Sequence, residues 1–233
     1  MSYRESVNSL QQSLGLTCEP ITITFHETIP FGVERIGSAA PAGCAYWRLA
    51  ADGQVFYTVG DDHLNCPIGA YTHGVELTAG AQDELEGMIQ KMVGLQYLRI
   101  EELAGIPRRK QAPQYIVYAP LSKTQGGADV VLLRGNARQM MLVVEAANAR
   151  SLMSTFPVMG RPACAVIATC IESGAAATSL GCIGNRVYTQ LSDNEFYVAL
   201  PGRVLAETVE AIKSIAIANS ELEAYHRGRC ACA

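Results

Sequence analysis

Hydrophobic residues recur along the chain at two different spacings, and these spacings predict a mixture of helices and strands. Near the start, Val7, Leu10 and Leu14 lie at helical spacing, and the segment after Pro20, ITITFHE, alternates as a half-buried strand does. Further helices are predicted over residues 78–94, 137–150 and 203–225. Further strands are predicted over residues 44–50, 54–60, 114–120, 129–135, 164–172 and 195–200.

The same order of features occurs twice. Pro20 and Pro113 each precede a strand, and each strand is followed by a second predicted strand that begins with Cys-Ala. A second cysteine then lies in a glycine-containing turn of each half. The four cysteines of this pattern are Cys44 and Cys66 in the first half, and Cys164 and Cys182 in the second.

This repeat predicts an α+β fold made of internally duplicated halves. Each half would hold a mixed or antiparallel sheet flanked by helices, and a pseudo-twofold axis would relate the two. The halves are expected over residues 1–98 and 113–233, with a polar connector over 99–112, all packed as one globular unit. Such an axis would bring equivalent turns close together.

Composition narrows the class of protein. The chain has 233 residues, of which 49% are hydrophobic and 17% charged, and its net charge is −4. No basic stripe is present to neutralise phosphates, so no nucleic-acid partner is expected. No secretory signal and no apolar run of membrane-spanning length is found, so a cytoplasmic protein without membrane contact is expected. A homo-oligomer remains open.

Eight cysteines are many for a reducing compartment, where disulfide frameworks are rare. They are expected to be packed as small hydrophobic residues or to serve as ligands or nucleophiles. Cys18 and Cys170 fit the packed interpretation better. Cys230 and Cys232, in the final segment RCACA, are left open as either a passive tail or additional ligands.

Cys66 and Cys182 favour a functional interpretation because glycine follows each within three residues. Glycine lets the backbone approach whatever the sulfur binds. Together with Cys44 and Cys164 they would complete four-thiolate ligation of an iron–sulfur cluster or of tetrahedral zinc. No C-x-x-C spacing supports this, and haem is a further alternative.

Charged and aromatic neighbours suggest how such a site would be completed. Arg186 lies four residues after Cys182 and is predicted to hold an anionic small molecule or to offset thiolate charge. His63 and His73 flank Cys66, and each is either a cofactor-binding or acid–base group or a structural or exposed histidine. The familiar nucleotide-binding and hydrolase motifs are absent from the sequence.

Several segments, in this order, resemble one family. They are LGLTCEPITITF, NCPIGAYTHG, YAPL, DVVLLRGNARQMMLVVEA, SLGCIGNR and EFYVALPG, and they span residues 14–202. The chain is similar in these to domain of unknown function 169, an uncharacterised prokaryotic family. The resemblance implies a soluble bacterial or archaeal protein and supports Cys66, Cys182 and Arg186 as family-type positions. It implies no activity.

The sequence therefore predicts a cytoplasmic metalloprotein with an iron–sulfur cluster and a redox or small-anion-binding role. Two alternatives stay open. One is a metal-free enzyme with Cys66 or Cys182 as its nucleophile. The other is a non-catalytic carrier or sensor of haem or a metal.

Overall fold

The computed structural model describes residues 1–153 and 162–230 and contains one antiparallel sheet of six strands in the order β2-β3-β1-β4-β6-β5. This confirms the α+β class and the antiparallel alternative for the sheet. β1 and β4 meet at its centre, where Ile21 lies opposite Leu132. The strands are β1 (Ile21–His26), β2 (Phe56–Thr58), β3 (Tyr115–Pro120), β4 (Val130–Asn136), β5 (Ala177–Ser179) and β6 (Glu195–Pro201).

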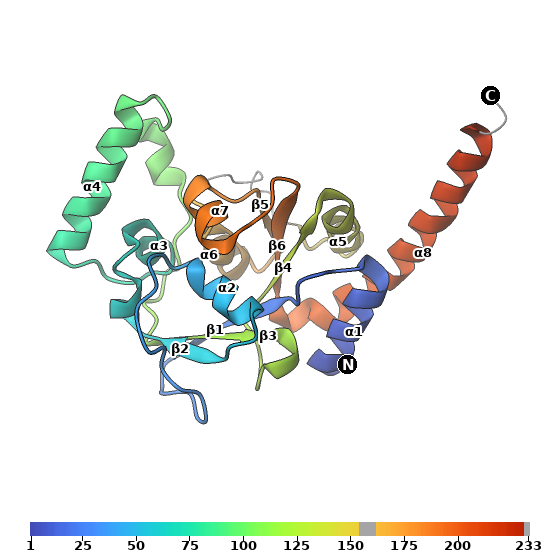
Figure 1. Ribbon diagram of the computed structural model, residues 1–233, viewed down its shortest axis with the longest axis horizontal. Helices are drawn as coiled ribbons and strands as arrows, with labels where there is room; N and C mark the ends of the chain where they lie inside the picture. Colours follow the sequence, from blue (N-terminus) through green and yellow to red (C-terminus); the bar gives the residue numbers. More distant parts are fainter. Residues whose placement is uncertain (154–161, 231–233) are drawn as a thin grey trace.

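Helices cover both faces of the sheet (Figure 1). One face carries α2 (Ala45–Ala51), α3 (Pro67–Thr72), α6 (Ala165–Ser173) and α7 (Ile183–Thr189). The other carries α1 (Tyr3–Leu14), α5 (Ala137–Ala149) and the first half of α8 (Leu205–Cys230). The short 3-10 helices are η1 (Gly60–His63), η2 (Ile100–Gly105), η3 (Leu121–Lys123) and η4 (Gly202–Val204).

The alternation of side chains along β4 divides the hydrophobic core in two. Val130 and Leu132 pack with the helices α2 and α6, whereas Val131 and Leu133 pack with α1, α5 and α8. Both faces of this strand are buried, so β4 appears in the sequence as a continuous apolar run. The first of these two cores contains Cys44, Cys164 and Cys170, and for this reason it holds the candidate site.

Helix ends follow local chemistry. The Ser2 side chain accepts from the Glu5 backbone N–H at the start of α1, and Glu5 returns the contact, while Gly15 ends the helix in a left-handed conformation. Asn136 and Gln139 form the same reciprocal cap at the start of α5. These caps explain why the helices predicted from periodicity near residues 7–16 and 137–150 are confirmed.

Two predicted strands are wrong. Residues 44–50 and 164–172 form the helices α2 and α6, and β2, within the predicted strand 54–60, pairs with β3. A short run that is apolar throughout fits both the helical period of about 3.6 residues and the strand period of about two. It contains no polar positions that would distinguish the two periods. The loop predicted over residues 156–163 lies mostly outside the described residues.

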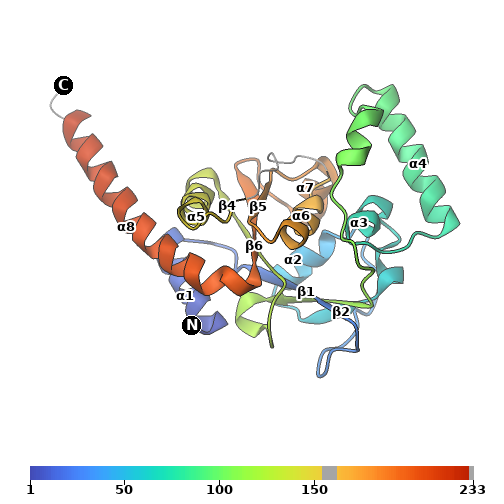
Figure 2. The same ribbon diagram turned by 180° about the vertical axis from the view of Figure 1, so that it is seen from behind.

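Two helices extend beyond the layers at opposite ends of the molecule, as both views show (Figures 1 and 2). α4 (Ala79–Gly94) buries only Ala81 and Leu85, and the second half of α8 is exposed. Neither they nor any other helix among the described residues is long and apolar enough to cross a membrane.

Replacing Ile23 at the sheet centre with alanine should destabilise the fold by about 2–5 kcal/mol, because the side chain is fully buried between β3 and β4. Urea unfolding measures this change. Ile29→Ala is the matched control, since Ile29 is 65% exposed. Its free energy of unfolding should change by less than about 0.5 kcal/mol. Equal effects of the two substitutions would contradict the placement of β1.

Candidate functional site

The four cysteines of the sequence repeat occupy the same local position. Each is the residue that precedes the first turn of a helix: Cys44 before α2, Cys66 before α3, Cys164 before α6 and Cys182 before α7. None of them uses its side chain to cap that helix. All four helices lie on one face of the sheet, and they pack as α2 with α7 and α3 with α6.

The four thiols lie close enough to influence one another electrostatically. Burial, with smaller contributions from the neighbouring Cys66 and Cys182, raises the pKa of Cys44 to about 12. Burial also raises the pKa of Cys164 well above its ordinary value, and Cys66, Cys44 and Cys182 add to the effect. The structure thus brings together the sulfur atoms of both halves of the chain. Cys44 and Cys164 are buried, and Cys66 and Cys182 are half-buried.

Glycine backbone surrounds the Cys66 sulfur. Burial raises the pKa of Cys66, and hydrogen bonding from the backbone of Gly43 and Gly69 opposes that rise. A Cβ atom added at Gly69 would lie 3.1 Å from the Cys66 sulfur and 3.9 Å from the Gly43 backbone nitrogen. Gly69 therefore leaves room for the Cys66 sulfur, and the backbone of Gly69 and Gly43 supplies donors to it.

Asn185 of α7 lies beside α2, the helix that Cys44 precedes. It is 1% exposed, and neither atom of its amide group has a hydrogen-bond partner at normal geometry. Its side chain nevertheless lies near the Cys44 thiol and lowers the pKa of that thiol. Tyr197 of β6 lies beside the same amide, and its hydroxyl donates to Thr189 Oγ1 at 3.0 Å. Buried amides usually have partners at normal geometry, so Asn185 keeps unused hydrogen-bonding capacity beside the Cys44 thiol.

His63 and His73 form a buried pair beside the cysteine helices. Their ring centroids are 5.5 Å apart, and each ring keeps one nitrogen without a partner: Nδ1 of His63 and Nε2 of His73. Burial lowers the pKa of His63 to about 3, and that of His73 to about 4, so both are neutral at pH 7. Thr58 Oγ1 lies 2.8 Å from His63 Nε2, and the Gly69 carbonyl lies 2.8 Å from His73 Nδ1.

Unpartnered polar atoms gather around the thiols. Among the described residues, seven buried side-chain nitrogen or oxygen atoms have no partner, and each of the four cysteine-led helices or its end residue carries at least one. Tyr118 of β3 has an unpartnered hydroxyl, and both Cys164 and Cys44 influence its pKa. The residues concerned are Trp47, His63, His73, Tyr118, Thr169 and Asn185.

Arg186 does not extend freely from α7. Its guanidinium donates to the Ser192 carbonyl at 2.9 Å and to the Leu180 carbonyl at 2.7 Å, and it lies 3.8 Å from Asp193. Arg186 therefore links Leu180, two residues before Cys182, to Ser192, which follows α7. The predicted contact of Arg186 with an anion stays a prediction.

The remaining cysteines are placed apart from the four. Cys170 is buried on α6, and no other cysteine is among the groups that influence its pKa. Cys18 is half-buried at a pocket, and Cys230 is exposed at the far end of α8. Cys232 lies outside the described residues. Throughout the described ranges the cysteines are free, and no group of three or more His, Cys, Asp or Glu is already arranged to hold a single metal ion.

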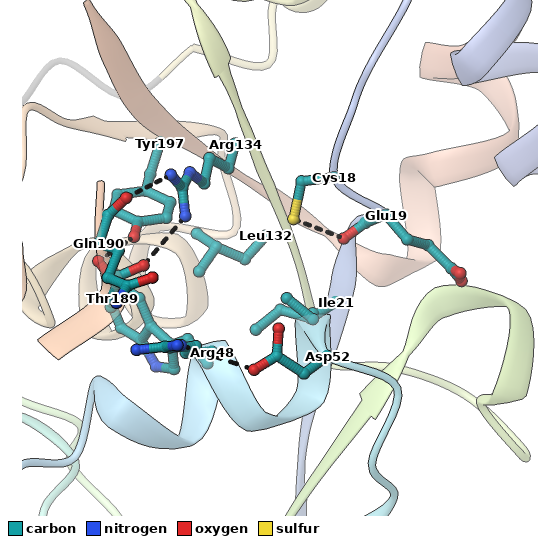
Figure 3. A pocket seen from close by; sticks show the side chains of 12 residues that line it. Cys18, Glu19, Ile21, Arg48, Asp52, Leu132, Arg134, Thr189, Gln190 and Tyr197 are labelled. Carbon is teal, nitrogen blue, oxygen red and sulfur yellow. Dashed lines mark hydrogen bonds and ion pairs between the residues drawn. The ribbon is translucent and has the colours of Figure 1, made fainter. Parts of the chain in front are cut away.

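A small pocket of about 170 Å³ opens next to this site, between α2, the end of α7 and strands β1, β4 and β6 (Figure 3). Ile21 and Leu132 lie at its back, and Arg48 and Asp52 of α2 lie along one side. Tyr197 belongs to both places, since it lines the pocket and also neighbours Asn185 and Cys44.

The model of one protein family matches residues 9–211. That family is described as uncharacterised ArCR, domain of unknown function 169. The chain belongs to this family. The match covers β1 to β6, and so includes all four clustered cysteines, Asn185 and the pocket. It ends within α8 and leaves Cys230 and Cys232 outside. No curated protein and no solved structure matches the chain.

Several residues of the site could not be identified from the sequence. Asn185 stands within the quoted motif GCIGNR, yet an asparagine three residues into a helix carries no signal of its own. Trp47, Tyr118 and Tyr197 reach the site only through sheet pairing and helix packing. None of them has a local sequence pattern that points to a thiol.

Acid should weaken the fold through the histidine pair. Since the folded-state pKa values lie near 3 and 4, the unfolded chain binds protons below about pH 6.5 while the folded protein does not. The free energy of unfolding should therefore fall as pH drops from 6.5 towards 4, by up to about 1.4 kcal/mol per pH unit for each histidine. Urea unfolding at pH 7, 6 and 5 measures the slope.

His63→Asn should flatten this slope, because one of the two buried rings is gone. His226→Asn is the matched control, since His226 is exposed on α8 and its removal should leave the slope unchanged. An identical slope in wild type and His63→Asn would contradict the assignment of a buried neutral His63.

Proposed function

We propose that the protein binds an iron–sulfur cluster through Cys44, Cys66, Cys164 and Cys182, and serves a redox role or presents the cluster to a small anion. One observation carries the proposal: thiols from sequence positions as far apart as 44 and 182 converge and interact at the starts of four helices. Four cysteine thiolates are the usual ligand set of such clusters.

The protonation of the thiols supports a metal partner. Burial raises the pKa of three of the four thiols, so without a cation they stay protonated at pH 7. Metal binding releases such protons and balances the thiolate charge that burial otherwise penalises. A cluster also places its own iron and sulfide atoms between the thiolates, so it does not require thiols gathered as closely as around a single ion.

Neighbouring donors fit the same group. The Gly43 and Gly69 backbone and the Asn185 amide act on the Cys66 and Cys44 sulfurs. Hydrogen bonds to ligand sulfur tune the reduction potential of a cluster. Among the described residues the Asn185 amide has no partner at normal hydrogen-bond geometry, and an inorganic or ligand sulfur would accept from its N–H groups. His63 is one of the predicted cofactor-binding residues, and its unpartnered Nδ1 would lie 3.4 Å from a Cβ atom added at Gly43.

Internal duplication would explain why the ligands come in equivalent pairs. The strand order supports it, because β1, β3 and β2 follow one another outward from the centre as β4, β6 and β5 do. Cross-packing supports it too, since α2 packs with α7 and α3 packs with α6. In this correspondence β3 belongs with the first half, so the boundary would fall between Lys123 and Val130.

The metal-free thiol enzyme is the weaker candidate. A cysteine nucleophile needs a lowered pKa, whereas burial raises the pKa of Cys66, one of the two predicted nucleophiles. Arg186, the cation expected to activate Cys182, is committed to backbone carbonyls. A cytoplasmic location is part of the proposal, because a reducing compartment would keep the clustered thiols free for a metal.

Protein purified without oxygen should be brown, absorb broadly near about 400 nm through iron–thiolate charge transfer, and contain iron and acid-labile sulfide. Cys66→Ser and Cys182→Ser should each abolish most of both. Metal analysis and the visible spectrum measure the loss.

Cys170→Ser and Cys230→Ser are the matched controls, the first buried and the second exposed, and both should keep full iron content. Colourless protein in which one cysteine is alkylated far faster than the rest would contradict the cluster proposal and support the thiol enzyme. Equal iron loss in Cys170→Ser and Cys66→Ser would show that the losses reflect misfolding, and would leave the ligand assignment without support.

A further inference from the structure

The pocket beside the thiol site has a lining of mixed chemistry. At its back lie the apolar side chains of Ile21 and Leu132, and Tyr197 and Trp47 form a further wall, with ring centroids 5.3 Å apart. Its volume of about 170 Å³ equals that of about six water molecules. A ligand of this size is a small metabolite rather than a nucleotide or a large cofactor.

Two of the charged groups near the pocket already have hydrogen-bond partners. Arg134 donates to the Glu195 carboxylate at 2.6 and 3.0 Å and to the carbonyls of Thr189 and Gln190, so its guanidinium is almost fully used. Glu19 turns its carboxylate out of the pocket (Figure 3), where it accepts from the Ser122 backbone N–H at 2.6 Å.

The remaining charges form one open pair on α2. Asp52 contacts only the Nε side of Arg48, at 3.6 Å, which is a long ion pair. Among the described residues no partner is found for the two terminal nitrogens of Arg48, and these are the atoms that grip a carboxylate in bidentate fashion. Arg48 and Asp52 thus place a cation and an anion one helical turn apart at the rim of the pocket. The apolar side chains of Ile21 and Leu132 lie at its back.

We propose that this pocket binds a small α-amino acid as its zwitterion. The carboxylate lies on Arg48, the ammonium group lies against Asp52, and the side chain rests on Ile21 and Leu132. A simple anion would face the Asp52 carboxylate, and a simple amine would face the Arg48 guanidinium, so each would meet one repulsive charge. The proposal does not rest on the cluster, because none of the four clustered cysteines lines the pocket.

Trp47 makes the test direct. It is the single tryptophan of the chain and lines the pocket, so its fluorescence reports occupancy without a label. Metal-free protein is titrated with L-alanine and L-valine, and with propanoate and propylamine as the two half-ligands. A saturable fluorescence change is expected with the amino acids, and affinity for either half-ligand should be at least about tenfold lower.

Substitutions of the rim charges test the zwitterion specifically. Arg48→Gln should weaken amino-acid binding by about tenfold or more. Asp52→Asn should also weaken amino-acid binding, whereas it would strengthen the binding of a simple anion. Arg227→Gln is the matched control, because Arg227 forms an exposed pair with Glu223 four residues away in α8 and lies far from the pocket. Its affinity should equal that of the wild type.

Ala51→Leu narrows the pocket without altering charge and should block binding. Circular dichroism melts confirm that each variant is folded. No saturable change with the amino acids, tighter amino-acid binding in Asp52→Asn, or propanoate binding as tight as that of alanine would each overturn the proposal. Iron content is measured separately. A negative result for amino-acid binding therefore does not affect the cluster proposal, and a protein without iron does not affect the amino-acid proposal.

Discussion

The antiparallel pairing of β1 with β4 holds the molecule together at its centre. Through this pairing, strands β2, β3 and β1 form one continuous sheet with β4, β6 and β5. The helices α2, α3, α6 and α7 then share one surface, and their first turns come together. Residues from distant parts of the sequence meet only because these two strands are neighbours.

The region where they meet is electrostatically unusual. Core positions normally hold apolar side chains or polar groups with partners. Here thiols with raised pKa values lie in one hydrophobic core, and two neutral histidines and the Asn185 amide lie beside them. Buried polar groups that lack partners at normal geometry cost folding stability. The cost is accounted for if a ligand uses these groups, and the proposed cluster would do so.

The repeated order of features in the sequence singled out the four cysteines that precede helices, but not the local structure around them. Glycine beside Cys66 and Cys182, and the repeated order of features, pointed to all four residues. The segments after Cys44 and Cys164 were predicted as strands because a short apolar run satisfies both periods. Tyr197 and Asn185 depend on contacts across the sheet and between helices, and Arg48 faces a pocket only because α2 packs against α7. Contacts between residues far apart in the chain produce no pattern in the local sequence.

Helix α2 belongs to both the thiol site and the pocket. Cys44 precedes its first residue, and Arg48 and Asp52 stand near its end. The seven residues of this helix span about 10 Å. The Cys44 sulfur and the charges at the pocket's rim are therefore held by one short helix, so its placement against the sheet fixes the positions of both.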